Sequence, residues 1–459
     1  MAPRVLVIGG DAAGMTAASA VNRLVEDVDV VVLERGTYTS YSACGIPFWI
    51  GGEIDSCDDL VARTPEQHRE RGIDVRLEST ATAVDVEGRT VTYTDAAGEH
   101  TLAWDRLVLG TGAASVRPDL PGIDATGIHT IKDIDDGHAV LAALDGDVRR
   151  AVVVGSGYIG MEMAEAFAGR GLRTTVIERE STPLPIVEDH VGEVIAEAMG
   201  RFGVELVTEA EVTGFGTNDG RVTSVQTAEG EHEADIVVVA FGVAPRTSLL
   251  PEARKGMKDG IVTDDQQRVT GLDSIWSAGD CVVTLDRLTG DLVHVPLGTH
   301  ANKQGLVAGE SIAASLGATW SGRTFPGIVQ TAITKFCDLE IARTGLGEQQ
   351  ARDAGFDPVV ATIETTTRAG YYPGAEAMHG LGIADRTTRR LLGVQVAGGA
   401  GAGLRIDAAA MALWNELTVD ELVMTDLSYA PPFSSVWSPI QVIARALTKE
   451  LNRGTDLPA

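Results

Sequence analysis

Two segments of the chain repeat one order of apolar and polar positions. Each starts with an unbroken apolar strand, at residues 4–8 or 150–154, and continues through a glycine-rich turn and a stretch of small residues. A second apolar run follows in each, at residues 28–34 or 174–178, and ends in an acid. Strands without polar alternation are typical of parallel sheets covered by helices on both faces. The pattern predicts two doubly wound, Rossmann-like α/β units, whose helices end near residues 25 and 170.

Shorter segments predict smaller elements around and after these units. Alternating residues at 89–93 and 221–227, bounded by Gly, Asp and Asn, indicate antiparallel inserts. From about residue 325 the pattern changes to strands at 328–333, 339–343, 359–365 and 391–396, and to helices at 408–416 and 440–451. We therefore expect a separate α+β domain at the C-terminal end, packed closely against the other two because no low-complexity linker intervenes.

Composition narrows the class of protein. Hydrophobic residues make up 44% and charged residues 22%, which is typical of a globular protein, and no apolar run is long enough to cross a bilayer. The net charge of −28 argues against nucleic-acid binding, because phosphate binding needs a concentrated basic face. Gly and Asp interrupt the first apolar run before a signal-peptide core forms, so we interpret that run as a strand.

The four cysteines have no spacing that suggests a metal site or a CxxC pair. They are Cys44, Cys57, Cys281 and Cys337. We therefore expect no metal and no disulfide scaffold, and a reducing cytoplasm is the compartment that fits best.

The glycine-rich turns predict two dinucleotide sites. Such a turn lets the backbone bend sharply and lets a pyrophosphate approach the N-terminus of the next helix. Gly155, Gly157 and Gly160 satisfy the full G-x-G-x-x-G pattern. The first turn, at residues 9–14, has Asp11 where the second glycine of the pattern normally stands. Its position between a strand and a predicted helix still indicates a dinucleotide.

An acid at the end of the second strand follows each turn. Glu34 and Glu178 can accept hydrogen bonds from ribose hydroxyls. A carboxylate at this place repels a 2′-phosphate, so the second site favours NADH over NADPH. Arg179 follows Glu178 directly and can pair with that phosphate, which leaves the nucleotide preference open.

Three further segments carry a family resemblance: LVLGTGA at residues 107–113, IWSAGDC at residues 275–281, and SYSACGIPFWIGG at residues 40–52. With the two turns, they resemble the pyridine nucleotide-disulfide oxidoreductases over essentially the whole chain. The resemblance implies an FAD-binding domain at residues 1–112 and 245–324, an NAD(P)H-binding domain at 113–244, and a dimerisation domain at 325–459. It also implies that Gly279 and Asp280 place a carboxylate on the ribityl chain of FAD.

The segment around Cys44 resembles the single-cysteine branch of this family. Most disulfide reductases of the family carry two cysteines as C-x4-C, but here Trp49 stands at the second position. The branch contains coenzyme A-disulfide reductases, NADH oxidases and peroxidases, and persulfide reductases. Members with oxygen or peroxide chemistry often carry His where this chain has Ala12. The resemblance implies that Cys44 is redox-active, and the CGIPF run is closer to the coenzyme A-disulfide reductases.

The C-terminal segments GYYPG, at residues 370–374, and SYAPPFS, at residues 428–434, resemble those that supply active-site tyrosines across the dimer. This implies that Tyr371 and Tyr429 are catalytic in a homodimer. Three polar positions of the family's coenzyme A cradle are apolar here, at Ala20, Ala43 and Trp437. The predicted substrate-binding residues that remain are Arg23, Ser40, Asn302 and Lys303, whereas we expect Arg71 to be solvated.

The resemblance thus implies an FAD-dependent NAD(P)H:disulfide oxidoreductase that reduces a small disulfide, such as one of coenzyme A, through Cys44. We expect the following helix and the flavin to lower the pKa of this thiol. Alternatives are an NADH oxidase or peroxidase, a persulfide reductase, and an electron-transfer reductase for a protein carrier. The predicted cofactor-binding residues are Gly9, Gly10, Asp11, Ala12, Ala13, Gly14, Glu34, Arg35, Thr111, Gly112, Gly155, Gly157, Tyr158, Ile159, Gly160, Glu178, Arg179, Gly279 and Asp280.

Overall fold

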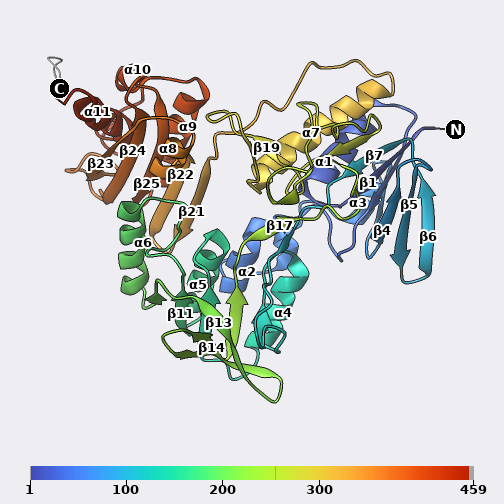
Figure 1. The fold of residues 1–459 in the computed structure, drawn as a ribbon, viewed down its shortest axis with the longest axis horizontal. Coiled ribbons are helices and arrows are strands. Elements are labelled where there is room, and N and C mark those ends of the chain that lie inside the picture. Colours follow the sequence, from blue (N-terminus) through green and yellow to red (C-terminus); the bar gives the residue numbers. More distant parts are fainter. Residues whose placement is uncertain (1, 254, 454–459) are drawn as a thin grey trace.

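The computed structural model describes residues 2–253 and 255–453, and it contains three large sheets. Residues 1, 254 and 454–459, which belong to the predicted first and last domains, lie outside this description. Figure 1 shows the C-terminal unit on one side, the N-terminal unit on the other, and the second unit between and below them. Within the described ranges, no helix is both long and apolar enough to span a membrane.

The first unit is a five-stranded parallel sheet built around the first glycine-rich turn. Helices α1 and α7 pack side by side on it (Figure 1). Close approach is possible because Gly305 and Gly309 of α7 face the backbone of Ala13 and Ala17 in α1. The sheet order is β18 (Ile275–Ser277), β7 (Arg106–Leu109), β1 (Arg4–Ile8), β2 (Asp29–Leu33) and β3 (Ile73–Arg76); the helices are α1 (Ala12–Leu24), α3 (Pro65–Arg69) and α7 (Gly298–Ser315); and a meander follows at β4 (Thr80–Asp85), β5 (Thr90–Asp95) and β6 (Gly98–Ala103).

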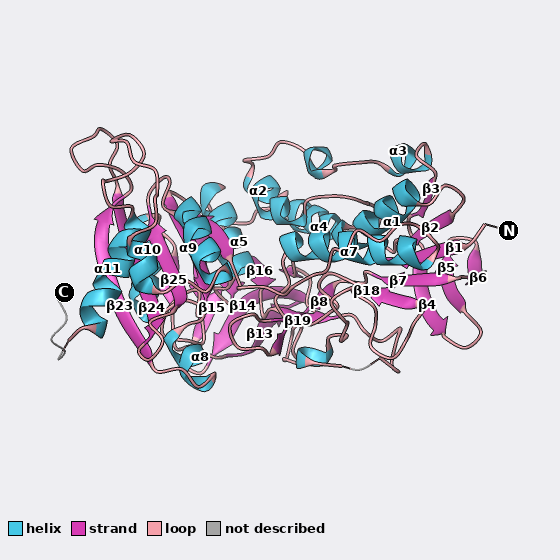
Figure 2. Ribbon diagram, turned by 90° about the horizontal axis from the view of Figure 1, so that it is seen from above, coloured by secondary structure: helices cyan, strands magenta, loops and turns pink. Residues whose placement is uncertain are grey.

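The second unit repeats this arrangement around the second turn. It is again a five-stranded parallel sheet with a three-stranded insert, and Figure 2 shows helix α4 in one layer with α1 and α7, on the same side of the strands. The sheet order is β12 (Glu205–Val207), β11 (Arg173–Ile177), β10 (Arg150–Val154), β16 (Ile236–Val239) and β9 (Ile128–His129); the helices are α4 (Ile134–Leu144), α5 (Tyr158–Gly169) and α6 (Asp189–Arg201); the insert is β13 (Val212–Asn218), β14 (Arg221–Thr227) and β15 (Glu231–Glu233); and the short pair β8 (Ala113–Ser115) and β17 (Val243–Pro245) joins the two crossings between the units.

The third unit is an antiparallel sheet, and two details differ from the sequence prediction. The strand predicted at residues 328–333 begins later, at Ala332, and β24 was not predicted. In β24, Gly380 and Gly382 take inward positions against Ile443 and Leu447 of α11, so the strand lacks the alternation of large apolar residues that would reveal it. The sheet order is β21 (Ala332–Phe336), β22 (Leu339–Gly345), β25 (Leu391–Gly398), β24 (Ala377–Asp385) and β23 (Pro358–Thr366), with α8 (Glu348–Asp353), α9 (Ile406–Trp414), α10 (Val419–Val423) and α11 (Pro439–Leu451).

A short helix, α2 (Ile46–Gly51), connects the first two units. Its buried Ile46 and Ile50 belong to the same apolar cluster as Met161 and Phe167 of α5. The guanidinium of Arg170 also donates to the carbonyl oxygen of Ile50. Because α2 begins two residues after Cys44, this packing fixes the cysteine at the junction of the two units.

Candidate active site

The first glycine-rich turn lies between β1 and α1 and is held by the acid at the end of β2. The Gly9 N–H donates to the Leu33 carbonyl at 2.8 Å. The two oxygens of Glu34 accept from the N–H groups of Gly10, at 2.6 Å, and Gly36, at 2.7 Å. Glu34 therefore fixes the turn against the neighbouring strand, at the carboxyl edge of the sheet where nucleotides bind in such folds.

The second turn has the same construction in the second unit. The Gly155 N–H donates to the Ile177 carbonyl at 2.8 Å. Buried Glu178 accepts from the N–H of Ser156 at 2.8 Å and from its hydroxyl at 2.6 Å, and its other oxygen accepts from the Glu180 N–H at 3.0 Å. Three hydrogen bonds thus tie Glu178 to the turn and to the residues after β11. The lone pair that remains on Oε1 is available to a ribose hydroxyl.

The helices after both turns begin without protein groups that would occupy their first N–H groups. Helix α1 starts at Ala12 and α5 at Tyr158, neither N-cap side chain accepts a hydrogen bond, and neither first turn contains an acid. Uncapped N–H groups and the helix dipole together favour an anion. Both turns therefore fit the pyrophosphate of a dinucleotide.

Asp11 occupies the one irregular position of the first turn. Its carboxylate accepts from the Tyr41 N–H at 3.2 Å. Burial, and then the charge of Glu34, raise the pKa of Asp11 to about 6, although the Tyr41 hydrogen bond lowers it. The side chain is thus directed toward the segment that leads to Cys44, and it carries a partly buried charge at neutral pH.

Replacing Asp11 with Asn is expected to stabilise the protein at pH 8 and to lose this effect as the pH falls to about 4. The folded-state pKa lies above the ordinary value of 3.8, so folding takes up a proton between these pH values, and the wild-type carboxylate lowers stability above pH 6. The difference between the folded-state pKa of about 6 and the ordinary value of 3.8 corresponds to at most about 3 kcal/mol in the free energy of unfolding. Thermal unfolding at both pH values measures the effect.

Asp124→Asn is the matched control, because the side chain of Asp124 is 94% exposed. We expect its melting temperature to follow the wild type at both pH values. A D11N protein that melts below the wild type at pH 8 would contradict the assignment of Asp11 as a destabilising buried charge.

The loop after β18 brings Asp280 to the junction of the units. Its carboxylate accepts from the Lys132 ammonium at 2.8 Å, and both side chains are largely buried. The Gly279 N–H donates to Gln304 of α7 at 2.8 Å, and a ring nitrogen of His294 contacts the Asp280 carbonyl at 2.8 Å. These contacts position the predicted ribityl-binding carboxylate. Lys132 has no motif around it, so the sequence did not reveal it.

The remaining predicted cofactor residues lie around the same edge. The Thr111 hydroxyl donates to the Arg246 carbonyl at 2.5 Å, and Gly112 follows with a φ of 65°. Arg35, after Glu34, pairs with Asp133 at 3.3 Å and is half exposed. Ala13 and Ile159 lie in the first turns of α1 and α5.

Cys44 lies in a 3₁₀ turn directly before α2 and is exposed. The charged groups that act on its thiol are Glu162 of α5, Lys132, Asp280, and Asp11 of the first turn. Groups from both dinucleotide-binding units therefore surround the thiol, although they are far apart in the sequence.

The protein raises the pKa of Cys44, contrary to the sequence prediction for the helix that follows it. Partial withdrawal from water is the main cause, followed by the Glu162 carboxylate, while Lys132 lowers the pKa. Helix α2, which follows the thiol, has only six residues.

Glu162 is a second group that the sequence analysis missed. Burial, and then Glu165, raise its pKa to about 7, although the Thr334 hydroxyl, which donates at 3.0 Å, lowers it. Near neutral pH this carboxyl can both donate and accept a proton, and its charge raises the pKa of the Cys44 thiol. Its position one helical turn after Tyr158 was the available signal, because side chains four residues apart share a helix face. Tyr158 itself is withdrawn from water, which raises its pKa.

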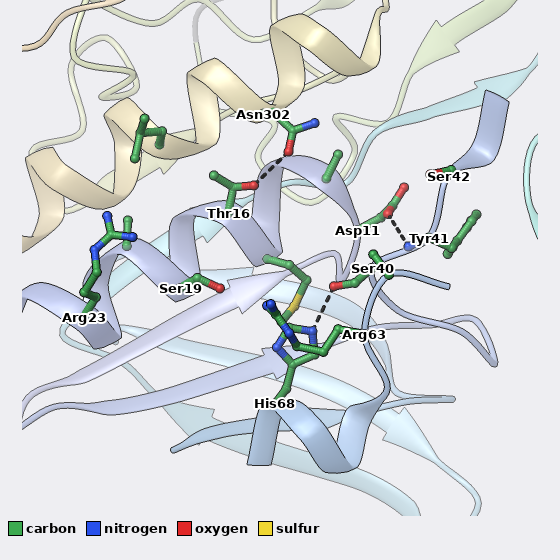
Figure 3. A pocket seen from close by; sticks show the side chains of 15 residues that line it. Asp11, Thr16, Ser19, Arg23, Ser40, Tyr41, Ser42, Arg63, His68 and Asn302 are labelled. Atoms are coloured by element: carbon green, nitrogen blue, oxygen red, sulfur yellow. Dashed lines mark hydrogen bonds between the residues drawn. The ribbon is translucent and has the colours of Figure 1, made fainter. Parts of the chain in front are cut away.

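A cavity of about 400 Å³ opens beside this site, between α1, α7 and the segment before Cys44 (Figure 3). It has the size of a small-molecule site. Its polar and charged lining residues are Asp11, Thr16, Ser19, Arg23, Ser40, Tyr41, Ser42, Arg63, His68 and Asn302. The predicted substrate residues Arg23, Ser40 and Asn302 thus come together, whereas Lys303 and Arg71 do not line the cavity.

Two further residues of this cavity were not predicted, Arg63 and His68. A ring nitrogen of buried His68 contacts the Ser40 hydroxyl at 2.9 Å (Figure 3). Burial, followed by the charges of Arg63 and Arg71, lowers the pKa of His68 to about 4, so it is neutral at physiological pH. The positive charge at the cavity comes from Arg23 and Arg63, which suits an anionic ligand.

Comparison with known proteins identifies the family. Residues 3–305 match the model of the pyridine nucleotide-disulphide oxidoreductases, and residues 331–439 match the dimerisation domain of the same family. The chain belongs to the pyridine nucleotide-disulphide oxidoreductase family. This confirms the predicted family, the two dinucleotide-binding α/β units with an α+β dimerisation domain, and the oxidoreductase class.

Several members of this family are similar over nearly the whole chain. An NAD(P)H coenzyme A polysulfide/persulfide reductase of Pyrococcus horikoshii is 38% identical over 97% of this chain and 99% of its own. A coenzyme A disulfide reductase of Staphylococcus haemolyticus is 28% identical over 94% and 96% of the two chains. The structure of an NAD-dependent persulfide reductase from A. fulgidus, 33% identical, superposes with a TM-score of 0.93 over 98% of this chain and 83% of that one.

The dimerisation domain brings the two predicted tyrosines together on its surface. Tyr371 is 78% exposed and Tyr429 is 47% exposed. The hydrogen bond between the two tyrosine side chains raises the pKa of Tyr371. Exposed apolar side chains nearby in the sequence are Tyr372, Phe433, Val436 and Trp437. Both tyrosine side chains are thus open to solvent in the single chain.

Among the described residues, no group of three or more His, Cys, Asp or Glu side chains could hold a metal ion. All four cysteines are free; Cys57 and Cys281 are buried and Cys337 is partly buried. Cys44 thus has no second thiol of its own chain as a disulfide partner.

Proposed function

We propose that the protein is an FAD-dependent NAD(P)H:disulfide oxidoreductase that reduces a small disulfide through Cys44. The observation that carries this proposal is the position of Cys44, where Asp11 and Asp280 of one unit and Glu162 of the other act on a single exposed thiol. A structural cysteine would not need this position. A thiol without a protein partner has to exchange with an external one.

The residues for FAD would be those of the first turn, with Glu34 and Asp280, and the residues for the nicotinamide dinucleotide would be those of the second turn. When bound, these two cofactors would supply the hydride and two-electron chemistry that reduces a sulfur–sulfur bond at Cys44. Tyr158 is the first residue of α5, directly after the second turn, and its ring would help to exclude water from the nucleotide site.

The chain's own groups would then handle thiol exchange. The Cys44 thiolate attacks one sulfur of the substrate disulfide, a mixed disulfide forms, and the other sulfur leaves as a thiolate that needs a proton. Glu162, with a pKa of about 7, can hold the proton that Cys44 loses. Tyr371 and Tyr429 of a second protomer would donate to the leaving thiolate, and a dimerisation domain and its exposed apolar surface support a homodimer.

The cavity lined by Arg23 and Arg63 would receive the anionic part of the substrate. The relatives named for coenzyme A substrates support a coenzyme A disulfide or a related thiol. The apolar positions Ala20, Ala43 and Trp437 reduce the number of polar contacts for such a ligand. Free cysteines throughout the chain support a reducing, cytoplasmic location.

Anaerobic NADH consumption with and without coenzyme A disulfide tests this function. We expect fast, disulfide-dependent turnover under nitrogen and slow turnover under air without disulfide. Fast turnover under air with no disulfide would favour an NADH oxidase and would contradict the proposal. Ala12, where a His supports peroxide chemistry in related proteins, makes the peroxidase alternative the weaker one.

Persulfide reduction is the second candidate function, because two similar proteins are named for it. The Cys44 thiolate would attack the outer sulfur of a persulfide, so that the parent thiol leaves and Cys44 itself becomes a persulfide. Two electrons from NADH, through the bound FAD, would then break this sulfur–sulfur bond and release sulfide. Measuring sulfide with a persulfide substrate, beside thiol release with a disulfide, decides between the two substrates.

A further inference from the structure

Arg179 follows strand β11 directly and belongs to an acidic surface. Its guanidinium donates from two nitrogens to one oxygen of Glu180, at 2.9 and 3.1 Å. Glu180 is the main cause of the raised pKa of Arg179, and Glu178 and Glu211 add to it. Three carboxylates thus act on the Arg179 cation at this strand end.

The backbone around this pair is fixed by the second turn. The Glu180 N–H donates to the Glu178 carboxylate at 3.0 Å, and the Glu180 carbonyl accepts from the Glu209 N–H at 3.0 Å. Glu178 in turn holds Ser156 of the turn. The pairing of Arg179 with Glu180 is therefore set beside the place where the acid of such a fold meets the adenosine ribose.

We propose that Glu180 is a specificity-determining residue that makes this enzyme select NADH over NADPH, because it occupies the Arg179 guanidinium that a 2′-phosphate would need. The inference rests on the proposed use of a nicotinamide dinucleotide at the second turn. It goes beyond the acid at Glu178, whose carboxylate is buried and already bonded to the turn.

NADH and NADPH differ only at the 2′-oxygen of the adenosine ribose, which is a hydroxyl in NADH and carries a phosphate in NADPH. A ribose hydroxyl needs only the free lone pairs of Glu178, and the Arg179 pair stays intact. A 2′-phosphate brings about two negative charges against Glu178, Glu180 and Glu211. It has to share Arg179 with Glu180, whose carboxylate already accepts from two guanidinium nitrogens and stays beside the phosphate.

The test is the binding of NAD⁺ and NADP⁺ to the holoenzyme, measured by calorimetry, with kcat/KM for NADH and NADPH as the second readout. We expect wild type to bind NAD⁺ more tightly. The E180Q protein should lower the ratio of the two dissociation constants, NADP⁺ over NAD⁺, by about fivefold, the upper effect expected for one exposed ion pair. The R179Q/E180Q double variant should lose most of that gain.

Glu205→Gln is the matched control. Glu205 pairs with Arg173 at 3.9 Å at the opposite end of β11, so this variant removes the same charge from the same sheet without touching the turn. Its ratio should equal that of wild type. The inference is overturned if E180Q and E205Q give the same ratio, if the gain persists without Arg179, or if wild type prefers NADP⁺. Absence of binding of either nucleotide to wild type would instead overturn the proposed function, and this inference with it.

Discussion

Cys44→Ser protein is expected to lose disulfide-dependent NADH turnover by on the order of a thousandfold, as expected when the nucleophile of a covalent mechanism is removed. It should still bind FAD and accept electrons from NADH, because the turns, Glu34 and Asp280 are unaffected. A serine hydroxyl is isosteric with the thiol but cannot form the mixed disulfide. The result would separate the chemistry of the thiol from that of the cofactors.

The measurement is anaerobic steady-state turnover with disulfide, beside stopped-flow bleaching of flavin absorbance by NADH. Cys337→Ser is the control, since Cys337 is also accessible to solvent in part but follows β21 in the dimerisation domain. We expect it to retain wild-type turnover. Undiminished turnover in C44S would exclude the thiol mechanism and would favour an electron-transfer reductase for a protein carrier.

Gly157→Ala is expected to weaken nucleotide binding and Gly160→Ala to lower stability, although both glycines belong to one motif. A Cβ at Gly157 would meet no protein atom within 4 Å, so Ala is accepted by the fold and lies on the open face of the turn. A Cβ at Gly160 would lie 1.9 Å from the Gly155 carbonyl oxygen. We expect G157A to weaken NAD⁺ binding by about tenfold or more at wild-type stability, because the Cβ obstructs the pyrophosphate. G160A should lose about 1–3 kcal/mol of stability through the clash.

Calorimetric titration with NAD⁺ and thermal unfolding measure the two effects separately. Gly169→Ala, at the far end of α5 where an added Cβ also meets nothing, should leave NAD⁺ binding unchanged and should not lower stability, since Ala has a higher helix propensity than Gly. If G157A binds NAD⁺ as wild type does, the second turn is not a pyrophosphate site. If G160A unfolds like wild type, the close contact between the helix and the turn is not essential.

The sequence by itself determined the features that depend on local backbone chemistry. The two turns need glycine where a Cβ would strike the backbone, as at Gly14 and Gly160, so a regular spacing of glycines is visible in the chain. Buried parallel strands need unbroken apolar runs, and these were predicted to within one or two residues at β1, β2 and β10. The single thiol of its motif, Cys44, was found because the position of a second cysteine holds Trp49.

Only the tertiary structure decided which distant groups meet. Lys132, Arg63 and His68 carry no local signal, because their roles arise from contacts across separate elements. Glu162 has only its spacing of four residues from Tyr158. The direction of the pKa shift at Cys44 was also decided there, since burial and the Glu162 carboxylate raise this pKa. Strand β24 was hidden for the same reason: its glycines make room for α11, which lies far along the chain. Local conformational requirements are written into adjacent residues, whereas electrostatics and packing depend on distances that only the folded chain sets.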